Sequence, residues 1–279
     1  MSGTLYLVAT PIGNLGDFSP RAVETLRSVD FIAAEDTRVT IKLLNHFGIK
    51  KPLISYFEHN RAQSGEKIIA RLLSGENVAL VSDAGMPAIS DPGEDMVRLC
   101  AENEVPVCVV PGACAVVSAL ALSALSTQRF TFEGFLNTAR KQRMEHLDSL
   151  KNERRTMVIY EAPHKLCGTL EDLKSTFGGE RRLSLCRELT KLHEETIRTT
   201  IDGAIELYKT IPPKGEYVLV IEGKRDSGEP EMTLEQALER LEQYRSEGKS
   251  LKQAAKLAAE DSGFGKNELY NAAIEKQLS

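Results

Sequence analysis

The chain has 279 residues, of which 42% are hydrophobic and 27% are charged, as in ordinary globular proteins. Its net charge of -5 argues against binding nucleic acid through bulk electrostatics, and no apolar run reaches membrane-spanning length. The start of the chain lacks a secretory pattern, and the five cysteines show no Cys-x-x-Cys spacing. We therefore expect a reduced, cytoplasmic protein without a zinc site or a disulfide framework.

The first part of the chain alternates short apolar runs with amphipathic patterns. Strands are predicted over residues 4–9, 31–34, 77–82 and 105–110. Helices are predicted over residues 20–28, 37–47 and 65–74. The first helix begins at Ser19-Pro20, an N-cap followed by a proline at the first helical position. Alternating strands and helices predict an α/β domain with a mostly parallel sheet, at residues 1–126.

Three of these strands end in loops that contain glycine and proline. Residues 81–93 read V-S-D-A-G-M-P-A-I-S-D-P-G, and similar loops lie at residues 10–17 and 111–115. Glycine lets the backbone approach a ligand closely, and parallel strands place their carboxyl ends at one edge of the sheet. We expect the three loops to form one pocket for a small molecule, with Asp83 at its edge.

The pattern changes after residue 126. Residues 129–134, R-F-T-F-E-G, alternate in the manner of an antiparallel strand, and a basic helix is predicted over residues 138–151. Further strands are predicted at residues 157–160, 182–187, 195–200 and 217–222, with helices near residues 165–177 and 202–209. This pattern indicates a second α/β domain at residues 127–225, with a mixed or antiparallel sheet.

A polar segment at residues 223–230 precedes a small C-terminal helical module at residues 231–279. Thr233 and Ser250 are predicted N-caps of the first two helices, and a third helix is expected to begin at Lys266. Short helices joined by glycine-containing turns are typical of a helix-turn-helix-like module.

Several common catalytic motifs are missing. No G-x-G-x-x-G follows the first strand, Gly248-Lys249-Ser250 lacks the rest of a P-loop, and there is no G-x-S-x-G elbow. The five histidines lie far apart, so no metal site is predicted. Hydride transfer, ATP hydrolysis, serine hydrolysis and zinc chemistry all lose support.

Three strings place acids beside basic residues at strand ends. They are A-E-D-T-R at residues 34–38, Y-E-A-P-H-K at residues 160–165 and R-E-L-T-K-L-H-E-E at residues 187–195. Any one string fits helix capping and surface ion pairs, but three at strand ends facing one crevice favour a functional site. Basic clusters at residues 140–143, 151–155 and 181–191 fit solvated surfaces and leave an RNA partner open.

These strings, with Y-L-V-A-T-P-I-G-N-L-G-D at residues 6–17 and the loop at residues 81–93, closely resemble the ribosomal RNA small subunit methyltransferase I family. That family belongs to the tetrapyrrole-methylase-like, class III group of S-adenosylmethionine enzymes. The C-terminal strings A-A-K-L-A-A and K-N-E-L-Y resemble the family's helical tail. The resemblance implies a homodimer that uses S-adenosyl-L-methionine and no metal. It further implies 2′-O-methylation of a cytidine ribose in the decoding region of 16S rRNA, within the small ribosomal subunit.

The resemblance also places the cofactor between the two α/β domains. The residues that it implies for the cofactor site are Pro11, Asp83, Met86, Ala88, Ile89, Ala113, Cys114, Ala115, Tyr160, Arg187, Glu216 and Tyr217. The family commonly has Thr where Met86 stands, Pro-Ser at Ala113-Cys114 and Pro at Asn137. Because Cys114 still offers its backbone amide, we expect cofactor binding to survive these departures.

Methyl transfer to a ribose hydroxyl requires in-line positioning, worth up to roughly 7–11 kcal/mol, and a proton acceptor would help it. The candidates for accepting the proton, or for holding an acid or phosphate, are Glu35, Asp36, Arg38, His164 and Glu188. The residue types alone leave the identity of the base open.

Two other functions fit part of the pattern. A tetrapyrrole C-methyltransferase of the uroporphyrinogen or precorrin type would carry the same glycine and proline loops. A non-enzymatic RNA-binding assembly factor would use the cofactor only as a structural ligand. The strings A-E-D-T-R and E-A-P-H-K, the helical tail and the basic clusters favour the RNA enzyme. The acidic net charge favours a folded particle as its substrate over naked RNA.

Overall fold

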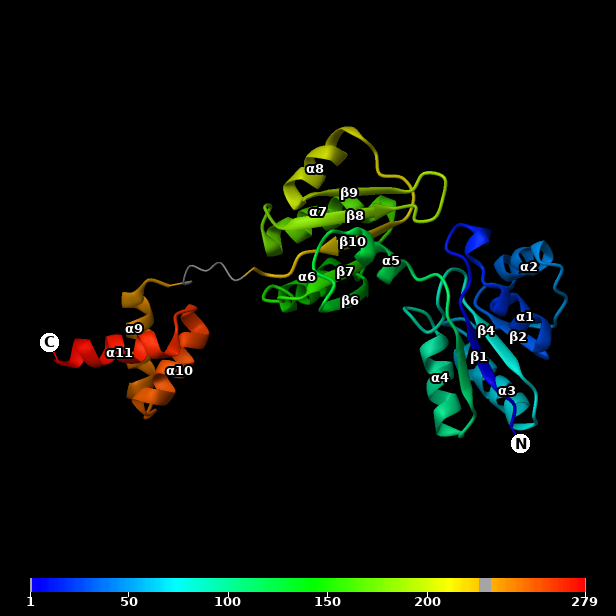
Figure 1. The fold of residues 1–279 in the computed structure, drawn as a ribbon, viewed down its shortest axis with the longest axis horizontal. Helices are drawn as coiled ribbons and strands as arrows, with labels where there is room; N and C mark the ends of the chain where they lie inside the picture. Colours follow the sequence, from blue (N-terminus) through cyan, green and yellow to red (C-terminus); the bar gives the residue numbers. More distant parts are fainter. Residues whose placement is uncertain (1, 226–231, 279) are drawn as a thin grey trace. The chain divides into compact units, whose positions relative to one another are not determined.

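The computed structural model describes residues 2–225 and 232–278, which fall into two compact units, Met1–Lys224 and Arg225–Ser279 (Figure 1). Much of the predicted polar segment at residues 223–230 lies outside the described residues. Within the described ranges, no helix has both the length and the apolar character needed to cross a membrane.

The first unit begins with a five-stranded parallel sheet in the order β3-β2-β4-β1-β5. Its strands are β1 (Leu5–Val8), β2 (Phe31–Ala34), β3 (Leu53–Ser55), β4 (Val78–Val81) and β5 (Val107–Val110). Strands β2 and β4 are buried along their whole length, as expected when helices cover both faces of a parallel sheet. The predicted parallel sheet is confirmed, and β3 is an additional strand that the sequence patterns did not reveal.

Helices on both faces hold this sheet in place. They are η1 (Leu15–Asp17), α1 (Pro20–Ser28), α2 (Thr37–His46), α3 (Arg61–Leu73) and α4 (Gly93–Glu102). Ser19 caps α1 by accepting a hydrogen bond from the backbone N–H of Ala22, as the sequence predicted. Helices α1 and α2 pack on one face through Leu26 and Leu44, whereas α3 and α4 pack on the other through Ile68 and Met96.

The order of the strands in the first sheet indicates where along its carboxyl edge a ligand would bind. The chain leaves β2 toward β3 and leaves β4 toward β5, in opposite directions from two neighbouring strands. Ligands of open α/β sheets bind outside the carboxyl ends of strands at such a point. The loop after β1 joins this edge, because Thr10 and Gly85 exchange backbone hydrogen bonds of 2.9 and 3.1 Å.

A second five-stranded sheet follows, in the order β6-β7-β10-β8-β9. Its strands are β6 (Phe130–Phe135), β7 (Thr156–Glu161), β8 (Arg182–Arg187), β9 (Glu195–Thr200) and β10 (Tyr217–Ile221). Three of the four pairings are antiparallel, but β6 runs parallel to β7, so the antiparallel prediction for residues 129–134 is wrong. Strand β6 lies at the edge of the sheet and is only partly buried along its length. Its connection to β7 through α6 (Arg140–Ser149) is a crossover, which joins parallel strands.

Each face of the second sheet is covered differently (Figure 1). One face carries α6, α7 (Pro163–Phe177) and α8 (Ile201–Thr210) over a large apolar core. The other face packs against α5 (Ala115–Leu122), where Val116 and Leu120 share a cluster with Val158 and Val218. Because α5 directly follows β5 of the first sheet, this packing brings the strand-end loops of the first sheet against the second.

The second unit consists of α9 (Leu234–Ser246), α10 (Leu251–Ser262) and α11 (Lys266–Leu278). Thr233 and Ser250 cap the first two helices, each in a capping box, which confirms both predicted caps. The core of this unit is built largely from alanine and leucine, including Ala254 and Leu269.

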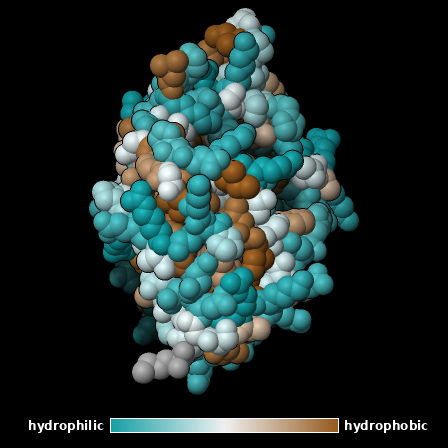
Figure 2. All heavy atoms as spheres, turned by 90° about the vertical axis from the view of Figure 1, so that its right-hand side faces the viewer, coloured by the Kyte–Doolittle hydropathy of each residue, from teal (hydrophilic) through white to brown (hydrophobic). Residues whose placement is uncertain are grey.

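Figure 2 shows that the surface on the side of α1 and α2 is mainly hydrophilic, with a strip of apolar side chains near its centre.

Candidate functional site

A cavity of about 470 Å³ lies where the loops of the first sheet meet the second sheet, a volume within the usual range for small-molecule sites. The first sheet and α5 contribute Ile12, Glu35, Ser82, Ala84, Ile89, Ser90, Asp91 and Ala115. The second sheet and its loops contribute Phe135, Tyr160, Glu161, Ala162, Pro163, Cys186, Leu189, Glu216, Tyr217 and Val218. All three glycine- and proline-containing loops reach this cavity, as the sequence predicted.

Glycine is required where these loops approach one another. Gly85 has a φ of +89°, and a Cβ atom there would lie 3.1 Å from Cγ2 of Ile12 and 3.4 Å from the carbonyl oxygen of Ala113. A Cβ atom on Gly112 would lie 2.9 Å from that of Ala9. Side chains at these positions would fill the junction of the three loops, so glycine keeps the edge of the cavity lined by backbone.

Backbone strain concentrates in the two loops on either side of the cavity. Six non-glycine residues among those described have a left-handed φ, and four of them are Ala88, Ser90, Glu188 and Thr190. Such a conformation costs on the order of 1–3 kcal/mol per residue and persists where the surrounding structure fixes it. This clustering supports a functional role for the loops after β4 and β8.

Carboxylates gather where β2 and β4 diverge. The backbone N–H of Asp83 donates to Oε2 of Glu35 (3.2 Å), and the N–H of Asp36 donates to Oδ1 of Asp83 (3.0 Å). Burial raises the pKa of Glu35, and the carboxylates of Asp83 and Asp91 raise it further, against the opposing effect of the Asp83 N–H. Burial also raises the pKa of Asp83. Glu35 therefore combines a position on the cavity wall with a strengthened basicity.

Asp36 and Arg38 form a local pair at the start of α2. The carboxylate of Asp36 accepts hydrogen bonds from the backbone N–H of Arg38 (2.8 Å) and from its guanidinium (2.6 Å), and the bond from the guanidinium is the main reason that its pKa falls to about 2. The Arg38 side chain is 87% exposed, and neither residue lines the cavity. This pair is a helix cap, which shapes the turn that follows Glu35.

The other two candidates for proton transfer are also placed away from the cavity wall. His164 is exposed in the first turn of α7. The carboxylate of Glu188 accepts hydrogen bonds from the N–H of Glu216 (3.0 Å) and from Nζ of Lys191 (2.9 Å), which lower its pKa. Of the five residues predicted for this role, Glu35 is the one that lines the cavity.

The residues predicted for cofactor binding fall into groups. Ile89, Ala115, Tyr160, Glu216 and Tyr217 line the 470 Å³ cavity. Pro11 and Asp83 line a neighbouring cavity of about 270 Å³, whose wall shares Ser82 with the larger one. The remaining residues lie outside both walls: Met86 and Ala88 pack against the core of the first sheet, Ala113 and Cys114 immediately precede α5, and Arg187 pairs with Glu195 at 3.4 Å.

The two predicted tyrosines meet the cavity in different ways. The ring of Tyr160 packs on the α5 side of the sheet, and burial raises its pKa to about 12. The side chain of Tyr217 belongs to the core on the opposite face, where its hydroxyl oxygen lies 3.2 Å from that of Tyr208 and accepts a hydrogen bond from the N–H of Lys214. Tyr217 therefore presents its backbone to the cavity.

Sequence reasoning missed several wall residues, among them Asp91, Phe135 and Glu161. The Asp91 carboxylate accepts from the N–H groups of Ala88 (2.9 Å) and Gly93 (2.7 Å), so it holds its own loop in shape. Asp91 and Glu161 lie within the strings at residues 81–93 and 160–165, in which other residues were predicted for the site. For Phe135 no local signal existed, because its position depends on the irregular pairing of β6.

Comparisons with known families agree with this architecture. The family model of the tetrapyrrole (corrin/porphyrin) methylases matches residues 4–205, and that of the RsmI C-terminal HTH domain matches residues 232–277. Among solved structures, uroporphyrin-III-C-methyltransferase from Thermus thermophilus has a TM-score of 0.56 at 20% identity, covering 78% of this chain and 94% of that one. Diphthine synthase has a TM-score of 0.59 at 13% identity, over 79% and 90%. At these identities the structures show a shared fold.

Closer relatives come from curated proteins. A ribosomal RNA small subunit methyltransferase I from Synechocystis is 49% identical over 98% of both chains. A protein of the same name from Bacillus subtilis is 46% identical over 99% of this chain and 95% of its own length. The likeness thus extends over both units. The chain belongs to the tetrapyrrole methylase family and, within it, to the ribosomal RNA small subunit methyltransferase I family.

Proposed function

We propose that this protein uses S-adenosyl-L-methionine to methylate the 2′-oxygen of a cytidine ribose in the decoding region of 16S rRNA, acting on the small ribosomal subunit in the cytoplasm. The observation that carries the proposal is the cavity between the two sheets, with a basic carboxylate on its wall, in a chain 49% identical to a named relative.

The residues present fit the methyl donor, which carries a sulfonium, an ammonium group, a carboxylate and an adenosine. Four acidic residues, Glu35, Asp91, Glu161 and Glu216, contribute to the cavity wall, although the Glu161 carboxylate binds Oγ1 of Thr169 on the α7 side of the sheet. Acids suit a ligand with two cationic groups. The Tyr160 ring and the backbone kept open by Gly85 supply apolar and close polar contacts. A Thermus thermophilus uroporphyrin-III C-methyltransferase with this fold was solved in complex with S-adenosyl homocysteine, at a TM-score of 0.55 over 78% of this chain.

The bound cofactor supplies an electrophilic methyl group, and the protein has to orient the acceptor and remove its proton. We assign the proton acceptor to Glu35. Its raised pKa makes it a stronger base than an exposed carboxylate, while it stays ionised above that pKa. The N–H of Asp83 fixes one oxygen of Glu35, which leaves the other free to face the ribose hydroxyl.

The remaining predicted residues act around this centre. Ile89, Ala115, Tyr160, Glu216 and Tyr217 would hold the cofactor directly, because they line the cavity. Asp36, Arg38 and Glu188 would act through the turns they stabilise. Pro11 and Asp83, on the adjoining cavity, would contact the part of the cofactor or the ribose nearest the first sheet.

We further propose the domain boundaries 1–126, 127–225 and 231–279, and a homodimer as the working form. The edge strand β5 leaves Val109 52% exposed, and α5 leaves Val117 51% exposed. An apolar edge of this kind is suited to a second copy of the chain. Light scattering on the purified protein measures this directly, and a monomer at assay concentration would contradict it.

Transfer of labelled methyl groups tests the function. Small ribosomal subunits from cells that lack this modification are incubated with the protein and methyl-labelled S-adenosylmethionine, and nucleosides from the 16S rRNA are identified by mass spectrometry. The proposal predicts label in 2′-O-methylcytidine. Label on a base would contradict the 2′-O assignment. Transfer to uroporphyrinogen in place of the subunit would contradict the proposal and support the C-methyltransferase.

A further inference from the structure

An exposed phenylalanine stands at the mouth of the cavity. Phe135, the last residue of β6, is 59% exposed and lines the cavity, and it is the most exposed phenylalanine among the described residues. Ile89, from the loop after β4, also lines the cavity and is 43% exposed. A built Cβ atom on Gly134 would lie 3.5 Å from Oγ of Ser90, so these two segments approach each other at the mouth.

A bulge in β6 puts Phe135 there. The register between β6 and β7 shifts between Phe132 and Gly134, where Gly134 has a φ of +64°. In a regular strand, residues 132 and 135 would point to opposite faces. The bulge instead lets both rings reach Tyr160, with centroids 5.0 Å from Phe132 and 5.3 Å from Phe135. Bulges beside active sites commonly redirect a side chain in this way.

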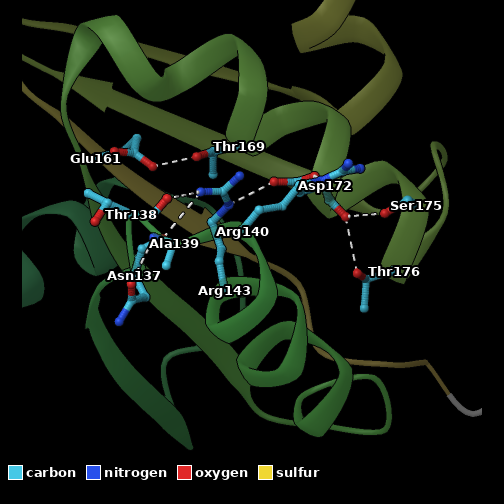
Figure 3. Close-up of polar contacts among 10 residues, drawn as sticks. All are labelled: Asn137, Thr138, Ala139, Arg140, Arg143, Glu161, Thr169, Asp172, Ser175 and Thr176. Carbon is cyan, nitrogen blue, oxygen red and sulfur yellow. Dashed lines mark hydrogen bonds and ion pairs between the residues drawn. The ribbon is translucent and has the colours of Figure 1, made fainter.

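Polar contacts hold the segment after Phe135, as Figure 3 shows. Nε of Arg143, on α6, donates to Asp172 of α7 (2.7 Å), and its Nη1 donates to the carbonyl oxygens of Asn137 and Thr138 (both 3.2 Å). The Arg143 side chain is 18% exposed and that of Asp172 is 9% exposed, so this contact is largely shielded from water. Phe135 is thus exposed without being loosely placed.

The strand behind the ring is fixed as well. Glu161, at the end of β7, accepts a hydrogen bond from Oγ1 of Thr169 (2.5 Å; Figure 3). It also accepts one from the N–H of Ala162 (2.8 Å), and the two contacts hold the turn leading to Pro163. Pro163 and Ala162 line the same cavity. The turn beside Phe135 is therefore preorganised, and the exposed ring of Phe135 faces water in the isolated chain.

We propose that Phe135 is the stacking platform for the nucleobase of the nucleotide being methylated. This inference rests on the proposed function and adds a substrate-positioning residue to it. Enzymes that modify nucleotides commonly turn the target out of its stack, and unstacked bases pack on aromatic side chains. The part of the cavity beside Ala115 suits the small cofactor, whereas the target nucleotide of a macromolecular substrate enters past Phe135 and places its ribose toward Glu35.

Substitution at Phe135 tests this role, with Phe130 as the matched control. Phe130 lies on the same strand, is 39% exposed and is not part of the cavity wall. For Phe135→Ala we expect the KM for unmodified small subunits to rise by about tenfold or more, since stacking on an aromatic ring contributes substantially to each bound base. The Kd for S-adenosylmethionine, measured by calorimetry, should stay within about twofold. Phe135→Tyr should retain the wild-type KM, and Phe130→Ala should match the wild type.

Two results would overturn the proposal. An unchanged KM in Phe135→Ala would show that the ring does not hold the substrate. A loss of cofactor affinity equal to the rise in KM would assign the ring to the cofactor.

A second measurement is the affinity of each variant for a decoding-region RNA hairpin, determined by fluorescence anisotropy. If the wild-type protein transfers no methyl group, the proposed function fails, while a drop in hairpin affinity for Phe135→Ala still decides whether the ring contacts RNA.

Discussion

The two walls of the cavity differ in chemistry. The wall from the first sheet carries Glu35 and Asp91 on loops after parallel strands, close to Asp83. The wall from the second sheet carries the rings of Phe135, placed by the bulge in β6, and of Tyr160 on β7. Burial raises the pKa of Glu35 most, and the divergent strand ends bring further carboxylates close enough to raise it more. Rigid apolar surfaces need a well-packed sheet. We therefore propose that Glu35, on the first wall, accepts the proton and that the rings of the second wall contribute to binding.

Of the substitutions described below, Glu35→Gln should have the largest effect, and that effect should be on the rate of methyl transfer. The substitution keeps the size of the side chain and removes its basicity, so we expect kcat to fall by about 10²–10⁴-fold, the usual contribution of a positioned base. The Kd for S-adenosylmethionine should change little. Glu24→Gln, at an exposed position on α1, serves as the control. A kcat for Glu35→Gln near that of the wild type would move the base elsewhere.

Tyr160→Ala tests the opposite wall. Removing a largely buried ring that packs beside Ala115 should weaken S-adenosylmethionine binding by about 10–100-fold, because the lost apolar contact is not replaced. Tyr160→Phe keeps the ring and should bind almost as well as the wild type. Calorimetry measures both affinities. If the alanine variant bound normally but lost kcat, the second wall would carry chemistry.

Deletion of residues 233–279 tests whether residues outside the two cavity walls also contribute to substrate affinity. The second unit is compact by itself and exposes Lys252 and Lys256 on α10. Lysines facing RNA phosphates contribute sequence-independent affinity, so we expect the KM for small subunits to rise by about tenfold while cofactor Kd stays the same. Equal losses in both quantities would argue against RNA docking by this unit.

Asp83→Asn should have the smallest effect and sharpens the electrostatic argument. The Asp83 carboxylate is one of the charges that raise the pKa of Glu35, so its neutralisation should lower that pKa. The rate requires ionised Glu35 and falls as pH drops through its pKa. The acid limb of the pH–kcat profile should therefore move to lower pH in the variant. A shift to higher pH, or no shift, would contradict Glu35 as the titrating base.

The sequence was most informative where local rules decide the structure. The caps at Ser19, Thr233 and Ser250 depend on residues a few positions apart, and all three were predicted correctly. Glu35 was a candidate because it directly follows a buried apolar run, and the ends of parallel strands meet at one edge. The neighbouring Asp36 and Arg38 looked equally functional in sequence, but their hydrogen bonds show a helix cap.

Features set by long-range pairing could not be predicted from the sequence patterns. The alternation in residues 129–134 carries no information on the direction of the partner strand, and β6 pairs in parallel with β7. The position of Phe135 depends on the register shift at Gly134, which appears only when β6 is paired with β7. Likewise, nothing local distinguishes Tyr217, which offers backbone to the cavity, from Tyr160, which offers its ring.

The most direct test of the account is a crystal structure of the protein with S-adenosylhomocysteine. The account predicts the ligand in the 470 Å³ cavity, in contact with Ala115, Tyr160 and the backbone of Tyr217, with its sulfur on the side of Glu35. Ligand density confined to the smaller cavity beside Val39 and Lys42 would contradict it, because the two walls would then not share the reaction.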